Sequence, residues 1–178
     1  QNIWNGNAAS AGEFSGFLSL MAADSDVVDV TATTVTASNV ITELGKVMDA
    51  IPAALYGKED LTIYVPQNVA KAYVRALGGF GASGLGANGV ENKGTMWYGD
   101  QPLYFDGVRV AMVNGLPSNK MVAAQSSNLY FGTGLLNERN EVRVLDMADL
   151  DGSDNIRVIL RFFAGVQYGI GTDVVLYS

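Results

Sequence analysis

The sequence contains no cysteine and no histidine among its 178 residues. Without cysteine, the chain forms no disulfide bond, no zinc site with thiolate ligands and no thiol nucleophile. Without histidine, it lacks the commonest general base, the commonest metal ligand and any Ser-His-Asp triad. An enzyme built on this chain would depend on carboxylates, lysine, tyrosine or a cofactor. We therefore expect a protein that is not an enzyme and that uses no metal and no cofactor.

Positive charge is scarce as well, with 11 lysines and arginines against 18 acidic residues and a net charge of −7. A surface with this balance does not displace the counterions of a nucleic acid, so we expect no specific nucleic-acid binding. No run approaches the ~20 apolar residues of a membrane span, and the first residues do not resemble a secretory leader, so we expect no membrane association. Because residue 1 is Gln, we expect a processed or trimmed product of a longer chain.

What is present is enough apolar sequence for a sizeable core, since 48% of the residues are hydrophobic. The clearest local signal is Asp60–Gly79. Alternating apolar residues over Leu61–Val65 predict a strand, which Pro66 ends because it has no N–H to donate. Apolar residues at helical spacing then predict a helix that ends at Gly78-Gly79. This strand, proline and helix form the unit around which we expect the rest to pack.

The other segments predict an α+β protein. One short helix should pack through Phe14, Phe17, Leu18 and Met21, and a second, capped by Ser38 or Asn39, through Ile41, Leu44, Val47, Met48 and Ile51 before Pro52 ends it. Asp106-Gly107 predicts a tight hairpin turn between two strands. Further strands are predicted at Val27–Thr36, Met121–Gln125, Glu141–Met147, Asn155–Phe163 and Val166–Ser178, with an aromatic-rich turn at 128–134.

The strand at Asn155–Phe163 has two different faces. Ile156, Val158, Leu160 and Phe162 share one face, and Arg157 and Arg161 share the other with Ile159 and Phe163. An apolar face opposite a mixed arginine and aromatic face suggests a second buried surface, such as a contact between subunits. A solvated outer sheet face is the alternative interpretation of the two arginines.

Residues 78–94 are rich in glycine and poor in large apolar side chains, which predicts a mobile loop. Within them, Gly79–Gly84 reads GFGASG and matches the dinucleotide fingerprint G-x-G-x-x-G. That fingerprint follows a strand and opens a helix, whereas here it follows a helix and leads into more glycine. A small dinucleotide-binding oxidoreductase is therefore kept only as a remote alternative.

Two further patterns could carry chemistry. Asp149–Asn155, DLDGSDN, has the oxygen density of a calcium loop, but its glycine and its twelfth position do not fit one, so a polar turn is the better interpretation. The carboxylate pairs at Glu59-Asp60 and at Asp24 and Asp26 are interpreted as solvated charges at strand ends. Lys71 and Arg75 form an i,i+4 basic pair on the polar face of the predicted helix, facing solvent or a partner.

Taken together, three stretches resemble the C-terminal two thirds of major capsid proteins of tailed bacteriophages with the HK97-like fold. They are IWNG…FSGFLSLMA, then NVITELGKVMDAIPAALYGKEDLTIYVPQNVAKAYVRAL, then NLYFGTGLL…EVRVLDMADLDGSDNIRVILRFFAGVQYGIGTDVVLY. The resemblance implies an A domain plus part of a P domain, without the N-arm, E-loop and spine helix. Residues 1–30 and 141–165 would belong to the P domain, and residues 31–140 and 166–178 to the A domain.

The resemblance also implies a structural coat protein that self-assembles into hexamers and pentamers and encloses DNA in an icosahedral head. Assembly would take place in the host cytoplasm, with a possible scaffold or maturation protease as partner, and the product would be located in the virion. An encapsulin-type nanocompartment shell is the alternative within the same fold. The expected subunit-contact residues are Glu141, Arg143, Arg157, Arg161, Lys71 and Arg75, and the expected mobile loop at the capsomer axis carries Gly79, Gly81, Gly84, Gly86 and Gly89.

Overall fold

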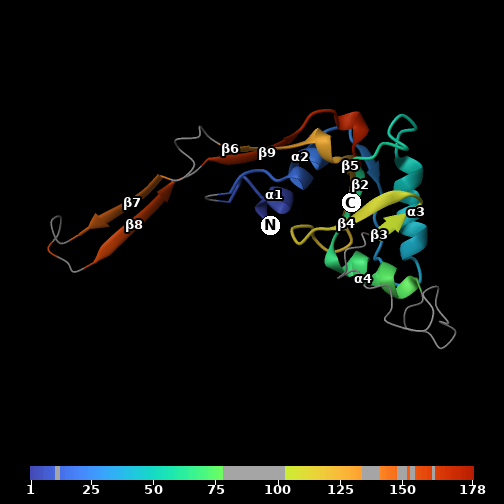
Figure 1. Ribbon diagram of the computed structural model, residues 1–178, viewed down its shortest axis with the longest axis horizontal. Coiled ribbons are helices and arrows are strands. Elements are labelled where there is room, and N and C mark those ends of the chain that lie inside the picture. Colours follow the sequence, from blue (N-terminus) through green and yellow to red (C-terminus); the bar gives the residue numbers. More distant parts are fainter. Residues whose placement is uncertain (11–12, 78–102, 134–140, 148–151, 153–154, 162) are drawn as a thin grey trace.

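The computed structural model describes all residues except 11–12, 78–102, 134–140, 148–151, 153–154 and 162 (Figure 1). Its helices are α1 (Asn2–Asn5), α2 (Phe17–Ala23), α3 (Val40–Ala50) and α4 (Gln67–Ala76). Its strands are β1 (Val28–Val30), β2 (Leu61–Val65), β3 (Leu103–Phe105), β4 (Val108–Met112), β5 (Met121–Gln125), β6 (Leu129–Thr133), β7 (Glu141–Asp146), β8 (Ile156–Arg161), β9 (Ala164–Tyr168) and β10 (Val175–Tyr177). The expected α+β class is confirmed.

The body of the protein is a mixed six-stranded sheet in the order β1-β10-β5-β2-β4-β3. The central strand β2 pairs in parallel with β4 and antiparallel with β5, while β10 lies between β1 and β5. Strands β6 and β9 form a separate two-stranded sheet, and so do β7 and β8. The strand, proline and helix unit is confirmed, because β2 ends at Val65 and Pro66 stands at the N-cap of α4.

The Asp106-Gly107 hairpin is also confirmed. The two residues join β3 to β4 with φ angles of 45° and 81°. Both angles lie in the left-handed region that a two-residue turn between antiparallel strands requires. Gly107 takes such an angle without steric cost, and Asp106 is among the few other residue types that tolerate it.

Several local predictions were wrong. The strand predicted over Val27–Thr36 is limited to Val28–Val30, and residues 129–133, predicted as a turn, form strand β6. Asn39 occupies the N-cap of α3 but makes no capping hydrogen bond, since its Oδ1 accepts the Thr36 amide N–H instead. Ile41 is half exposed, and Val40 takes its place in the buried stripe of α3.

Two apolar clusters lie on opposite faces of the six-stranded sheet. The larger one packs α3 and α4 against one face, through side chains such as Leu44, Val47, Val69 and Tyr73. The smaller one packs α1 and α2 against the other face, through Trp4, Phe17, Leu18 and Met21 over Val122, Ala124 and Leu176. The predicted packing of residues 17–21 on a core is thus confirmed, while Phe14 precedes α2 and is partly buried.

The strands β7 and β8 project from the body as an antiparallel ribbon (Figure 1). Glu141 pairs with Arg161 at its base and Asp146 with Ile156 toward its tip. The ladder between β6 and β9 lies between this ribbon and the body. Seven residues connect β6 to β7 and two connect β8 to β9, so the outgoing path is five residues longer than the returning one. The ribbon is the element that stands furthest from the two cores.

Candidate functional site

The ribbon presents an apolar face that no other described residue of the chain covers. Val144 and Val158 are direct cross-strand partners, and Ile156 stands two pairs further toward the tip, opposite Asp146. Their side chains are 64%, 63% and 71% exposed. Directly opposite residues of an antiparallel pair project from the same face, so these three side chains form an apolar surface that Asp146 borders at the tip. The segregation of Ile156 and Val158 from Arg157, predicted from the alternation, agrees with this register.

The second face of the ribbon carries charge. Arg143 is opposite Ile159, and Arg157 is opposite Leu145. Both arginines are exposed, while Ile159 and Leu145 are partly buried. Glu141 and Arg161 are register partners in the backbone ladder, and their side chains lie outside the described part of the structure. The structure therefore brings the predicted residues 141, 143, 157 and 161 together in one element.

Lys71 and Arg75 lie elsewhere. Both are exposed on α4, on the body of the protein and away from the projecting ribbon (Figure 1). The predicted contact residues therefore fall into two separate surfaces. Gly79, Gly81, Gly84, Gly86 and Gly89, and with them the GFGASG motif, lie outside the described residues.

The polar turn at the ribbon tip is described only in part. Gly152 has a φ of 71°, a conformation that glycine takes without strain, and Asn155 is exposed. The remaining residues of 149–154 lie outside the described part. Among the described residues, no three carboxylates gather in a group that could hold a metal ion.

Two of the carboxylates interpreted as solvated strand-end charges have specific partners instead. Asp60 accepts hydrogen bonds from Ser127 Oγ and Gln125 Nε2, and these bonds lower the pKa of its carboxyl. Asp24 accepts a 2.7 Å hydrogen bond from the Tyr168 hydroxyl, which lowers the Asp24 pKa in the same way. Both carboxylates fasten neighbouring segments of the fold, and that role accounts for them without acid–base chemistry.

Sequence reasoning missed a buried ionic group in the core. Glu43 on α3 is only 5% exposed, and its carboxylate accepts hydrogen bonds from Tyr177 on β10 and from Lys46 one turn along the helix. Burial raises the pKa of Glu43, but the hydrogen bonds and the Lys46 charge together outweigh it and leave the pKa below its usual value. The sequence shows only that Glu43 precedes Leu44 of the predicted stripe, whereas its partner Tyr177 comes from the other end of the chain.

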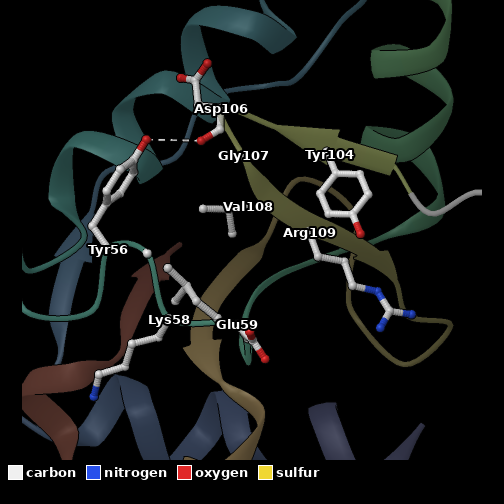
Figure 2. Close-up of a pocket in the computed structure, with 10 residues that line it drawn as sticks. Tyr56, Lys58, Glu59, Tyr104, Asp106, Gly107, Val108 and Arg109 are labelled. Atoms are coloured by element: carbon white, nitrogen blue, oxygen red, sulfur yellow. Dashed lines mark hydrogen bonds between the residues drawn. The ribbon is translucent and has the colours of Figure 1, made fainter.

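A shallow pocket of about 520 Å³ lies where β3 and β4 meet the loop before β2 (Figure 2). Leu61 and Val108 form its buried apolar part, while Tyr56 and Tyr104 stand exposed beside it. The Tyr56 hydroxyl donates a 3.1 Å hydrogen bond to the Asp106 carbonyl oxygen. Lys58, Glu59, Asp106 and Arg109 complete the rim with two charges of each sign. The rim therefore carries charges of both signs around a small apolar floor.

No helix of the described chain is both long and apolar enough to cross a membrane.

Comparison with known proteins gives fold neighbours only. No protein-family model and no curated protein sequence matches the chain. A chain of Mycobacterium phage Che8 matches with a TM-score of 0.56 and 16% identity over 85% of this chain and 53% of that chain. A chain of the satellite phage P4 procapsid including size determination (Sid) protein matches with a TM-score of 0.53 and 10% identity. The match covers 96% of this chain and 56% of that chain. A chain of a virus-like particle from Pyrococcus furiosus matches with a TM-score of 0.51 and 8% identity. The match covers 89% of this chain and 58% of that chain.

The protein therefore has the fold of phage capsid chains, and the HK97-like fold expected from the sequence is confirmed. At identities of 8 to 16%, the likeness concerns the fold alone. The chain spans between 53% and 58% of the length of these neighbours.

Proposed function

We propose that this chain is the core of a structural major capsid protein, which self-assembles through symmetric non-covalent contacts into a closed phage head around DNA. The exposed apolar face of the β7–β8 ribbon carries the proposal. A two-stranded ribbon is marginally stable in water on its own, and an exposed cross-strand pair of valines beside an isoleucine adds an unfavourable apolar surface. A second copy of the chain that covered this face would remove both disadvantages.

The energy available from such a contact is sufficient for weak, repeated association. Full burial of one Val or Ile side chain contributes about 1.5–3 kcal/mol. Three such side chains per ribbon, less the cost of association, give contacts that are individually weak. A closed shell multiplies weak contacts over many copies, so the whole can be stable while each contact remains reversible during assembly.

The division into A and P domains is part of the same proposal. The ribbon would belong to the P domain, and the sheet with α3 and α4 to the A domain. Within this role the chain needs no catalytic step and no cofactor, and we propose that it has none. An acidic surface would let enclosed DNA lie beside the protein without binding to it, in agreement with the net charge of −7. A scaffold or protease partner, and a location in the virion, would follow from assembly as a phage head.

The experiment is negative-stain microscopy with light-scattering mass on the longer parent protein and on this chain. The expected result is uniform shells or capsomers from the parent, and weak association or monomers from this chain. The triple variant Val144→Thr, Ile156→Thr and Val158→Thr of the parent should lose shells but keep the unfolding temperature of the isolated subunit. A parent that stays a monomer or dimer under all conditions, also when co-expressed with the genes beside its own, would refute the proposal.

A shell with other contents is the second candidate, because one of the fold neighbours is a chain of a virus-like particle. An encapsulin-type compartment would enclose a cargo enzyme instead of DNA. Purified shells separate the two: nuclease-protected DNA inside them supports the phage head, and a single co-purifying protein without DNA supports the compartment. The oxidoreductase alternative predicts dinucleotide binding by the isolated chain, and calorimetry with NAD should show none.

A further inference from the structure

The turn that follows β4 holds an asparagine directly before a glycine, Asn114-Gly115. An asparagine side chain can react with the backbone nitrogen of the next residue, and asparagine is for this reason among the thermolabile residues of proteins. Glycine permits the reaction best, because no side chain shields its nitrogen and its backbone adopts many conformations. The same pair occurs at Asn5-Gly6, at the end of α1, while Asn88-Gly89 lies outside the described residues. The structure distinguishes the two described pairs.

Both reacting groups of the Asn114 pair are without a hydrogen bond in the described part of the chain. Asn114 is exposed, and its side-chain amide bonds to no described residue. The Gly115 N–H donates to no acceptor among those residues. The Asn114 side chain can therefore rotate until its Cγ faces the Gly115 nitrogen, and no hydrogen bond has to break first. Because Asn114 is exposed, solvent water has access to the product.

The Asn5 pair is held by its helix instead. The Gly6 N–H donates a 2.9 Å hydrogen bond to the Asn2 carbonyl oxygen. A Cβ atom added at Gly6 would lie 2.5 Å from that same oxygen and closer still to the Phe14 carbonyl oxygen, so the backbone around Gly6 is tightly enclosed. The Gly6 nitrogen can turn toward the Asn5 side chain only when α1 opens locally, and the folded helix therefore protects this pair.

We propose that Asn114 is a site of spontaneous deamidation in the folded protein and that Asn5 is not. The Gly115 nitrogen gives up its proton and attacks the Asn114 Cγ, and the new N–Cγ bond closes a succinimide ring. The Cγ–Nδ2 bond breaks, and Nδ2 leaves as ammonia with a proton in place of the one that Gly115 lost. Water then opens the ring at either carbonyl carbon, which gives aspartate or isoaspartate. The inference does not rest on the proposed function.

The isoaspartate product changes the contact of the turn with α1. Its main chain runs through the Cβ and Cγ of residue 114, so the connection from β4 to β5 is lengthened by a methylene group. Gly115 packs closely on Trp4, since a Cβ atom added there would lie 3.0 Å from the Trp4 Cδ1 and 3.2 Å from the Trp4 Cβ. Trp4 in turn packs with Phe17 and Tyr64 in the smaller core cluster. A longer backbone at this turn therefore loosens the packing of α1 on the sheet.

Tryptic peptide mapping by mass spectrometry, after incubation of the folded chain in mildly alkaline buffer, tests the proposal. The tryptic peptide 110–120 contains both Asn114 and Asn119. Asn119 is the internal control, because its Oδ1 accepts hydrogen bonds from the Val35 amide N–H and from Asn68 Nδ2. Fragmentation of this peptide should locate the mass gain of deamidation, in which O replaces NH, at residue 114 alone.

The unfolded chain is the matched control for the role of the fold. In guanidinium chloride the α1 hydrogen bond is lost, so Asn5 and Asn114 should convert at similar rates. In the folded chain Asn114 should convert on the order of tenfold faster than Asn5, because only the Gly6 nitrogen is held by a backbone hydrogen bond. Equal rates in the folded chain, or an intact Asn114 there while both pairs convert in denaturant, would overturn the proposal.

Variants of residue 114 test the effect on α1. Asn114→Ser has no amide to lose and retains Asn88-Gly89, so it should keep its own unfolding temperature through the incubation while that of wild type falls. Freshly prepared Asn114→Asp carries the new charge without the longer backbone and should unfold at the temperature of fresh wild type. A fully converted wild type with an unchanged unfolding temperature would overturn the loosening of the Trp4 contact.

Discussion

The hydroxyl of Tyr177 donates a 2.7 Å hydrogen bond to the carboxylate of Glu43 in the core between α3 and the sheet. The same hydroxyl accepts the Thr33 amide N–H at 2.9 Å. Lys46 supplies the second partner of the carboxylate, from the helix surface. One phenol thus joins the last strand of the sheet to α3 and to the chain that follows β1, and it compensates a buried negative charge.

Tyr177→Phe should destabilise the protein by about 1–3 kcal/mol, because the buried Glu43 carboxylate and the Thr33 amide each lose a hydrogen-bond partner. The free energy of unfolding from urea titration measures the change. Tyr104→Phe is the control, since its ring is exposed and no described hydrogen bond uses its hydroxyl; its stability should equal that of wild type. An equal stability of both variants would show that the Tyr177 bond contributes nothing net.

The stability of the protein should fall as the pH falls below about 4.5, the ordinary pKa of a glutamate carboxyl. The folded-state pKa of Glu43 is lowered, so its contribution is fully present above the unfolded pKa and is lost as the pH falls through the folded pKa. Asp24 and Asp60 have lowered pKa values and act in the same direction.

Glu43→Gln is the variant that isolates this group. It should be less stable than wild type at pH 7, and the difference should narrow as the pH falls below about 4.5, because the Glu43 carboxyl takes up a proton in the unfolded chain before it does so in the folded one. Urea unfolding of both proteins across that range gives the two curves. Parallel curves would mean that Glu43 titrates alike in the folded and unfolded chain.

Replacement of Arg157 and Arg161 by alanine should weaken assembly of the parent protein while the unfolding temperature of the subunit stays almost unchanged. Arg157 is exposed on the charged face of the ribbon, so it has little to lose within one copy. Light-scattering mass reports assembly and calorimetry reports unfolding. A large drop in the unfolding temperature would instead place the arginines in the core of the subunit itself.

Two glycines should respond to alanine in opposite directions. A Cβ at Gly16 would lie 2.5 Å from the Gly6 backbone nitrogen and 2.7 Å from the Trp4 carbonyl oxygen, so Gly16→Ala should destabilise the protein by about 1–3 kcal/mol. Gly45 lies inside α3 with no atom within 4 Å of such a Cβ, so Gly45→Ala should stabilise it by about 0.5–1 kcal/mol. Thermal unfolding of the two variants beside wild type measures both the expected loss and the expected gain of stability.

The sequence predicts best where one residue type fixes the backbone. Pro66 ends β2 and opens α4, and Asp106-Gly107 turns the chain between β3 and β4, because the dihedral angles of these residues are restricted or unusually free. Composition alone was less reliable. The β-branched run over Val27–Thr36 forms a strand at Val28–Val30 only, since β1 has a partner only along the three residues of β10.

The candidate surfaces were predictable in part. Alternation assigned Ile156 and Val158 to one face of the ribbon, but only the fold shows that no described layer of the chain covers that face. The pocket depends on which strands are neighbours in the sheet. Arg109 and Thr62 are adjacent through the parallel pairing of β2 and β4, and no local pattern in the sequence specifies that pairing.

The position of β10 between β1 and β5 has a consequence for the timing of biosynthesis. Of the six strands in the sheet it is made last, and the Tyr177 hydroxyl on it contacts Thr33, 144 positions earlier in the chain. A nascent chain that has produced only β1 to β5 holds two separated halves, because the strand that joins them has not been synthesised.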